Sequence, residues 1–239
     1  MRIVIDLSNL AYICFYGLHY TNNPETQYDK EEFLENCHYK IQAIKYHTNA
    51  TEVSFAKDSL TQRKDLDDKY KANREKIIFP IKKDLIEELK THNAKIYKAD
   101  NKEADDIMAT LLKENKVDCI VSTDQDLLQA IEKGEQLFNP ITMSFWTLDK
   151  LKDKYHGLDK FENIIYYKSF FGDNSDNIPR VGFRLPKKPI VEKINTCTSI
   201  NNLVESLKDE KFFNKINTER VFLNYNLIKL DKNCIIKEF

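Results

Sequence analysis

The 239-residue sequence lacks several features that would assign it quickly to a class of protein. Its five cysteines are odd in number and contain no CxxC pair, which argues against a disulfide framework or a zinc ribbon. No apolar stretch reaches the roughly twenty residues of a membrane span, and Asp6 falls where a signal peptide would need an apolar core. We therefore expect a soluble cytoplasmic protein with reduced thiols and no membrane partner.

An excess of charge of either sign is also missing. With 37 basic and 38 acidic residues the formal net charge is −1, so no global basic field marks a nucleic-acid binder, and any anionic partner must be met locally. The five histidines show no HExxH or similar spacing, so a zinc site is not expected. The 41% hydrophobic and 31% charged residues are typical of a globular chain, long enough for a core domain with a smaller helical appendage.

Short apolar runs alternate with segments of helical periodicity in the first part of the chain. We expect strands over residues 2–5, 53–55, 95–97 and 119–121. Between them, helices are expected over residues 33–44, 81–89 and 104–112. This alternation predicts an α/β fold with a mostly parallel central sheet flanked by helices.

From about Thr147 the pattern becomes helical. Helical segments are expected over residues 148–155, 163–171, 189–194, 200–207 and 218–230. We therefore predict a sheet-containing domain over residues 1–146 and a C-terminal helical subdomain over residues 147–239.

Carboxylates follow each of the four expected strands. They are Asp6; Asp58; Glu103, Asp105 and Asp106; and Asp124 and Asp126. The carboxyl ends of parallel strands meet at one edge of a sheet, so these side chains are expected to converge there. Like charges that close together need a cation, and oxygen ligands without histidine or cysteine suit Mg²⁺ or Mn²⁺. A single aspartate is more often a solvated surface group or a helix cap. The predicted metal site therefore depends on several acids converging at one edge of the sheet.

The pair Asp124 and Asp126 supports the same prediction, because residues two apart in an extended chain point the same way and would face one metal pair. Further on, FFGDNSDNIP supplies Asp173 and Asp176. They either close the metal cluster from the other side or form an Asx-turn that stops a helix before Pro179. The residues alone leave both interpretations open.

A basic segment, RKDLDDKYKANREK, covers residues 63–76 and includes Arg63, Tyr70, Lys71 and Arg74. Such a run usually forms a solvated helix face. The alternative is a segment that grips phosphates and offers the tyrosine ring for stacking.

Five short motifs in a fixed order give the sequence a resemblance to the 5′-nucleases. They are DLSN beginning at Asp6, YKANR over 70–74, EADD over 103–106, STDQDL over 122–127 and GDNSDNIP over 172–179. The 5′-nuclease family includes flap endonucleases, the 5′-nuclease domain of bacterial DNA polymerase I and phage 5′-3′ exonucleases. The resemblance extends through most of the chain.

That resemblance implies a PIN-like nuclease fold and a set of site residues. Two Mg²⁺ or Mn²⁺ ions would be lined by Asp6, Asp58, Glu103, Asp105, Asp106, Asp124, Asp126, Asp173 and Asp176. Lys71 and Arg74, in an arch over roughly residues 60–80, would contact the scissile phosphate as catalytic groups. Further contacts to nucleic acid would come from Arg63, Tyr70, Lys187 and Lys188.

The implied reaction is two-metal hydrolysis of phosphodiesters near the 5′ end of branched or nicked DNA, or of RNA primers, during replication in a bacterial or phage-infected cell. The protein would act as a monomer, with single-stranded DNA-binding protein or other replication proteins as partners.

Two features depart from the family pattern. Phe55-Ala56 stands where family members carry Phe-Asp, with Asp58 two residues later. VGFRLPKKPIVEKI, residues 181–194, lacks the glycine pattern of the family's helix-hairpin-helix, so its K⁺ site is not expected. Two alternatives therefore stay open: a PIN-type ribonuclease, which would be smaller with fewer acids, and a branched-DNA-binding protein with impaired catalysis.

Overall fold

A computed structural model describes residues 1–18, 29–59, 62–72, 79–132 and 134–239. Its strands are β1 (Arg2–Asp6), β2 (Glu52–Ala56), β3 (Lys95–Lys98), β4 (Cys119–Val121), β5 (Gln136–Asn139), β6 (Ser144–Phe145) and β7 (Lys237–Glu238). They form one sheet in the order β6-β5-β4-β1-β2-β3-β7. Neighbours from β5 to β3 are parallel, and the edge strands β6 and β7 are antiparallel. The four strands expected from the sequence and the mostly parallel sheet are confirmed.

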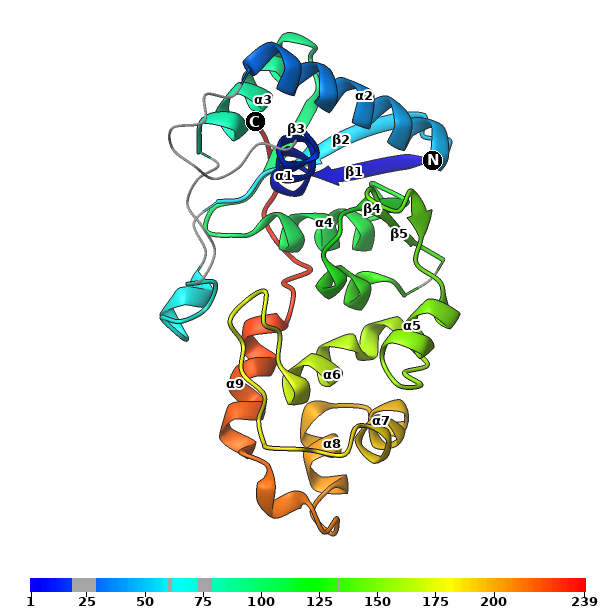
Figure 1. Ribbon diagram of the computed structural model, residues 1–239, viewed down its shortest axis with the longest axis vertical. Helices are drawn as coiled ribbons and strands as arrows, with labels where there is room; N and C mark the ends of the chain where they lie inside the picture. The colour runs from blue at the N-terminus through cyan, green and yellow to red at the C-terminus, as the bar shows by residue number, and fades with distance from the viewer. Residues whose placement is uncertain (19–28, 60–61, 73–78, 133) are drawn as a thin grey trace.

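Helices cover both faces of the sheet (Figure 1). On one face lie α1 (Leu7–Gly17), α2 (Lys30–Thr48) and α3 (Phe79–Thr91), and on the other lies α4 (Ala104–Lys113). Strand side chains alternate between these layers. Ile3 and Ile5 of β1 pack with the α1–α3 layer, whereas Val4 packs with α4. The centre of the sheet is therefore buried on both sides, which accounts for the continuous apolar runs of β1 and β4.

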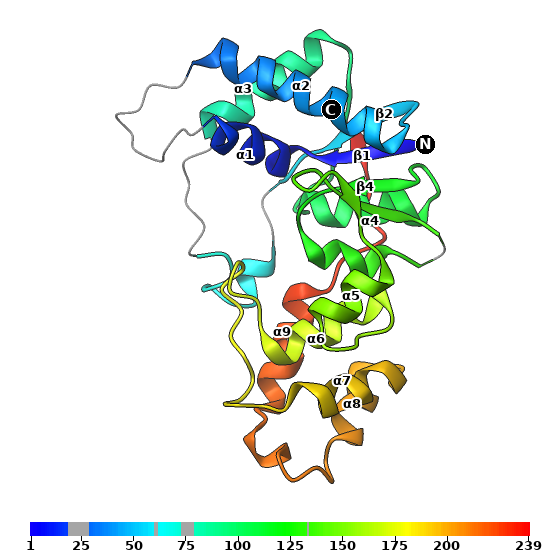
Figure 2. The ribbon, with the colours of Figure 1, turned by 45° about the vertical axis from the view of Figure 1, so that its right-hand side comes forward.

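The C-terminal half consists mainly of helices (Figure 2). They are α5 (Leu148–Lys154), α6 (Ile164–Phe171), α7 (Lys187–Thr196), α8 (Ile200–Ser206) and α9 (Thr218–Ile228). Their apolar side chains join the core on the α4 side of the sheet, which extends from Val4 to Leu203 and Val221. After α9 the chain returns to the sheet, where β7 pairs with β3. The helical character of this half is as expected, and the division at residue 146 stays a prediction.

Four 3₁₀ segments connect the larger elements in the described chain: η1 (Gln62–Asp65), η2 (Gln125–Ala130), η3 (Phe161–Asn163) and η4 (Phe213–Lys215). Among the described residues, no helix is both long enough and apolar enough to cross a bilayer.

The strand order reverses at β1, which lies between β4 and β2. In open α/β sheets, a crevice for ligands forms beyond the carboxyl ends of the strands at such a reversal. Asp6 ends β1, and Asp124 follows β4 by three residues. The topology thus places two of the predicted metal ligands at this crevice.

Candidate active site

A pocket of about 780 Å³ opens at the carboxyl ends of β1 and β4. Five of the nine predicted acids line it: Asp6, Asp58, Asp105, Asp124 and Asp173. Lys71 and Lys168 line the same pocket. The convergence expected at the sheet edge is therefore present, and it includes one acid from the GDNSDN motif.

Three of the pocket acids also cap helices. Asp6 caps α1, accepting a hydrogen bond from the Asn9 amide at 2.9 Å. Asp124 caps η2, accepting from the Asp126 amide at 2.9 Å. Asp58 accepts from the amide of Ala104, the first residue of α4, at 2.9 Å. Helix N-termini favour negative charge, so the capping role helps to hold these carboxylates beside one another.

Asp58 reaches the pocket although it lies two residues beyond the strand end where the family carries its aspartate. The Ser8 hydroxyl donates to it, and the Lys82 ammonium lies 3.8 Å from its Oδ2. Burial acts to raise the pKa of Asp58, but Lys82 and the hydrogen bonds from Ser8 and Ala104 outweigh it and hold the pKa below its ordinary value. Asp58 is therefore ionised at neutral pH.

For Asp6 and Asp105, hydrogen bonds and nearby cations do not offset the effect of burial on the pKa. Burial, with the nearby charges of Asp58 and Asp124, raises the pKa of Asp6 to about 7. Burial and Asp124 raise the pKa of Asp105 well above its usual range. Across the described ranges no side chain donates a hydrogen bond to Asp105. Five carboxylates line the pocket against four cations, Lys71, Lys154, Lys168 and Arg180, and Lys71 and Lys168 are shared with Glu103 and Asp126 behind it. The pocket thus fits a divalent cation.

The spacing of these carboxylates indicates the kind of cation. Within the part of the chain that the structure describes, no three of them bring ligand oxygens to within 4.8 Å of one another. Mg²⁺ and similar ions keep several waters and are held by one or two carboxylates together with substrate phosphates. A wide carboxylate pocket suits that mode of binding better than an all-protein cage.

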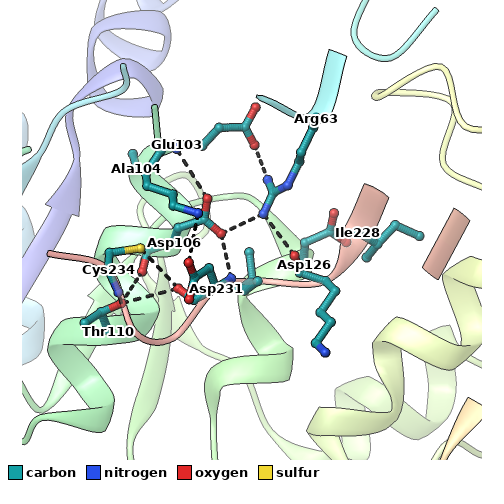
Figure 3. Close-up of polar contacts among 12 residues, drawn as sticks. Arg63, Glu103, Ala104, Asp106, Thr110, Asp126, Ile228, Asp231 and Cys234 are labelled. Atoms are coloured by element: carbon teal, nitrogen blue, oxygen red, sulfur yellow. Dashed lines mark hydrogen bonds and ion pairs between the residues drawn. The ribbon is translucent and has the colours of Figure 1, made fainter. Parts of the chain in front are cut away.

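The other four acids are buried against cations of the protein. The Arg63 guanidinium contacts Glu103 and donates to Asp106 at 2.7 Å (Figure 3). Lys71 donates to Glu103 at 2.9 Å and lies 3.8 Å from Asp176. These acids build the wall behind the pocket, and the structure does not place them among its lining residues.

Arg63 was predicted to contact nucleic acid, but its side chain is only 12% exposed. Besides the two acids, it donates to the backbone oxygen of Lys229 at 3.1 Å, joining the arch to the end of α9. Acids around it raise its pKa against the effect of burial, so it stays charged. The structure gives Arg63 an internal role, and a direct contact to nucleic acid stays a prediction.

The predicted arch residues are described only in part. Tyr70 is 2% exposed and its hydroxyl donates to Glu103 at 3.3 Å, so its ring offers no stacking face in this structure. Lys71 lines the pocket, and its backbone amide donates to the Asp176 carbonyl at 2.9 Å. Burial acts to lower the pKa of Lys71, but Glu103 and other neighbours raise it well above its usual value. Arg74 lies outside the described residues.

Asp124 and Asp126 differ from the extended geometry expected of them. They begin η2 rather than continuing β4, so their side chains diverge. Asp124 lines the pocket, whereas Asp126 is 6% exposed and contacts the Lys168 ammonium. The argument from residues two apart in a strand is therefore wrong for this pair.

Lys168 is a site residue that the sequence analysis missed. It lies on α6, contacts Asp126, and has its ammonium 2.6 Å from Asp173 Oδ2. Burial acts to lower its pKa, but Asp126, Asp124 and Asp173 raise it well above the ordinary value. A single lysine within the apolar run IIYYKSFF was the available signal, since a lysine on a buried face needs an acid.

The GDNSDN segment combines both interpretations that the sequence left open. Asp173 Oδ1 accepts from the Ser175 amide at 2.8 Å, which is an Asx-turn, while the same side chain lines the pocket. Backbone hydrogen bonds of 2.9 and 2.8 Å join Asp173 and Ile178 and close the turn. Gly172 has φ 73°, and a Cβ there would lie 2.5 Å from the Ile178 carbonyl oxygen. Asp176 is buried behind the pocket.

Lys187 and Lys188, predicted to contact phosphates, begin α7. Lys188 is exposed, and the Lys187 ammonium lies 6.0 Å from the ring centre of Phe171, which lines the pocket. Lys187 is therefore near the pocket, and the role of both lysines stays a prediction.

Comparison with known proteins identifies the family. The family model for the 5′-3′ exonuclease N-terminal resolvase-like domain matches residues 1–156. A 5′-3′ exonuclease of Buchnera aphidicola is 26% identical over 270 aligned positions, covering 99% of this chain and 92% of the relative. DNA polymerase I of Bacillus subtilis is 29% identical over 87% of this chain, which corresponds to only 24% of the polymerase.

Solved structures share the fold. A bacteriophage T5 flap endonuclease, crystallised with DNA and metal ions, matches 96% of this chain and 89% of its own, with a TM-score of 0.73 and 22% identity. Flap endonuclease-1 from Methanococcus jannaschii matches 95% of this chain with a TM-score of 0.54 and 12% identity. The chain belongs to the 5′-3′ exonuclease family, a family of nucleases, as its five motifs predicted.

Proposed function

We propose that this protein is a structure-specific 5′-nuclease that hydrolyses phosphodiesters near the 5′ end of flapped or nicked DNA with bound divalent cations. The observation that carries the proposal is the surplus of buried carboxylate charge around Asp6, Asp105 and Asp124 in the pocket at β1 and β4. A polyanionic substrate can enter so acidic a pocket only with cations between the two.

Asp6, Asp58, Asp105, Asp124 and Asp173 are the residues that would hold two Mg²⁺ or Mn²⁺ ions. When bound, such ions lower the pKa of a coordinated water and neutralise charge on the attacking and leaving oxygens. The protein contributes a fixed geometry, because Asp6, Asp58 and Asp124 are each held by a helix-capping hydrogen bond.

Lys71 and Lys168 supply part of the positive charge that the chain itself brings to the pocket, which Lys154 and Arg180 also line. Acids around Lys71 and Lys168 keep both of them protonated. Each ammonium would donate a hydrogen bond to a non-bridging oxygen of the scissile phosphate while keeping part of its contact with its acid partner. This hydrogen bond would stabilise the charge that the phosphate gains in the transition state. Arg74 would add a further cation from the arch.

The substrate would be a flapped or nicked duplex, or an RNA primer on DNA, with the duplex held by the helical subdomain near Lys187 and Lys188. The relatives named 5′-3′ exonuclease and flap endonuclease support this substrate class. We further propose that the protein works as a cytoplasmic monomer alongside single-stranded DNA-binding protein or other replication proteins.

A cleavage assay tests the function. A 5′-flap DNA and a plain single-stranded RNA are incubated with the protein in Mg²⁺ and in EDTA. We expect rapid cleavage of the flap in Mg²⁺, none in EDTA and much slower cleavage of the RNA. Preferred cleavage of the RNA would instead indicate a PIN-type ribonuclease.

An Asp105→Asn variant separates a working nuclease from a binding protein. We expect at least about 100-fold slower cleavage, with flap binding retained in a gel-shift assay. Asp209→Asn is the matched control, because Asp209 is exposed in the helical half and far along the chain from the pocket acids. Flap binding without Mg²⁺-dependent cleavage by the unaltered protein would contradict the proposal.

A further inference from the structure

Two histidines and a glutamate converge on the surface formed by α2 and α3. His38 lies on α2, Glu88 lies on α3, and His92 directly follows Thr91, the last residue of α3. Their ligand atoms all lie within 4.8 Å of one another, a convergence that no other group of three His, Cys, Asp or Glu side chains shows in the described ranges. The proposed nuclease function uses none of these residues.

The distances from Glu88 to the two histidines match those of a tetrahedral metal site. Glu88 Oε1 lies 3.1 Å from His92 Nε2 and 3.4 Å from His38 Nε2. Ligand atoms on a tetrahedral Zn²⁺ with bonds of roughly 2.0 to 2.1 Å stand about 3.3 to 3.4 Å apart. The two imidazole rings meet edge to face, with centres 5.4 Å apart at 79°, so both can direct Nε2 toward one point.

Rigid packing holds the three side chains in place. His92 follows Glu88 by four residues, just beyond the end of α3, and its Nε2 lies 3.1 Å from Glu88 Oε1. Their neighbours in sequence are buried in the core beneath: Cys37 precedes His38, and Leu89 follows Glu88, in the same hydrophobic cluster. Two of the three ligands, His38 and Glu88, are carried by helices that share a core, which positions them more precisely than loops would.

We infer that His38, Glu88 and His92 form a Zn²⁺ site that clamps α2 to α3. Two imidazoles and one carboxylate are a known zinc ligand set, and their exposure leaves the fourth position open to water. The carboxylate pocket, by contrast, is made of oxygen ligands that suit Mg²⁺. The histidine spacing in the sequence could not reveal this site, because its ligands come from two segments far apart in the chain.

The clamp is separate from the nuclease pocket. On α3, the residue that reaches a pocket acid is Lys82, which precedes Glu88 and His92 by roughly two to three helical turns, or about 9 to 15 Å. Zinc bound by the clamp therefore stabilises the helix pair without touching the substrate.

The test is a zinc titration of the full chain in excess Mg²⁺, which occupies the carboxylate pocket. Isothermal calorimetry is expected to give one Zn²⁺ per chain, with affinity at least 10-fold weaker in His92→Ala and in His38→Ala. His47→Ala is the matched control, since His47 is exposed on α2 outside the cluster, and it should bind zinc like the unaltered protein. Saturating zinc should raise the Tm of the unaltered protein by roughly 3 °C or more, but not that of His92→Ala.

Cobalt substitution gives a second readout that is independent of affinity. Co²⁺ in the clamp should show the intense visible absorption of a four-coordinate ion, lost in His92→Ala, while flap cleavage in Mg²⁺ is the same in both proteins. Equal zinc affinity in the unaltered protein and His92→Ala, or only the weak absorption of six-coordinate cobalt, would overturn the inference.

Discussion

The ammonium of Lys168 lies 2.6 Å from Asp173 Oδ2 and also contacts Asp126, so one cation from α6 joins the acid after β4 to the acid of the GDNSDN turn. The Asp126 oxygen that faces Lys168 is buried, and the ammonium is its charge compensation in the described chain. Lys168 thereby links the helical half of the protein to the end of the sheet.

Replacing Lys168 by methionine should therefore affect both stability and catalysis. Loss of the ammonium leaves the buried Asp126 and the partly buried Asp173 without their cation, so we expect the free energy of unfolding in EDTA to fall by about 3 kcal/mol. Flap cleavage should slow roughly 100-fold, because a phosphate-facing cation is lost. Urea denaturation and single-turnover cleavage measure the two effects. Lys152→Met, an exposed change on α5, is the control, and an equal response of both variants would contradict the assignment.

Arg63 has the corresponding role behind the pocket. Replacing it by methionine removes the partner of Glu103 and Asp106 while keeping an apolar side chain of similar length, so we expect a loss of about 3 kcal/mol in the free energy of unfolding. Urea denaturation tests this, with the exposed Arg184→Met as control. Should Arg63→Met instead keep full stability and only weaken DNA binding, the original prediction of a nucleic-acid contact would be favoured over the internal role.

The sequence predicted the fold best where burial produces a simple pattern. Strands β1 and β4 are buried along almost their whole length and read as apolar runs. In contrast, β7 consists of two exposed residues, Lys237 and Glu238, held to β3 by backbone pairing, so no side-chain pattern marks it. Helix α1 was missed although its buried residues Leu7, Leu10 and Ala11 follow helical spacing, because apolar residues also fill the rest of the segment.

The sequence predicted where the site lies in the fold, but not which cation each acid contacts. Acids after strand ends converge because parallel strands end at one edge, and this needs only the order of elements. Which acids face the pocket depends on the cations opposite them. Lys168 forms an ion pair with Asp126, and Arg63 forms one with Asp106. Each pair joins residues far apart in the sequence, so no local sequence pattern encodes it. The 3₁₀ turn at Asp124 likewise arises where β4 ends against the helical half.

The stability of the metal-free protein should fall as pH rises from about 5 to 8. Asp6 and Asp126 have pKa values raised to about 7, chiefly by burial, whereas unfolded aspartate titrates near 3.9. Between these values the folded state binds more protons than the unfolded state, so lower pH favours folding. Asp58 and Asp173, with pKa values lowered by their cationic and hydrogen-bonding neighbours against the effect of burial, oppose this only below about pH 4.

Thermal or urea unfolding in EDTA measures this dependence. We expect a loss on the order of 2 kcal/mol between pH 5.5 and 8, and stabilisation by Mg²⁺ that is larger at pH 8, where the carboxylates are ionised. Asp105→Asn should flatten the profile, because it removes one of the repelling charges. A metal-free protein that is more stable at pH 8 than at pH 5.5 would contradict the charge surplus.

Replacing Gly172 should destabilise the protein more than replacing a glycine of similar backbone conformation. In Gly172→Ala the new Cβ would lie 2.5 Å from the Ile178 carbonyl oxygen, whereas at Gly157, with φ 93°, it meets nothing within 4 Å. Both variants carry the strain of positive φ, but only Gly172→Ala should disturb the turn that places Asp173. We expect Gly172→Ala to lose about 2 kcal/mol more in the free energy of unfolding than Gly157→Ala, and to cleave flaps more slowly. Equal behaviour of the two variants would show that the turn tolerates the clash.

The most direct test of the carboxylate pocket as a divalent-metal site is a crystal structure of the protein grown with Mn²⁺, with anomalous scattering used to locate the ions. The account predicts two anomalous peaks in the pocket among Asp6, Asp58, Asp105, Asp124 and Asp173, and at most one in Asp105→Asn. An empty pocket in well-ordered crystals at millimolar Mn²⁺ would contradict it.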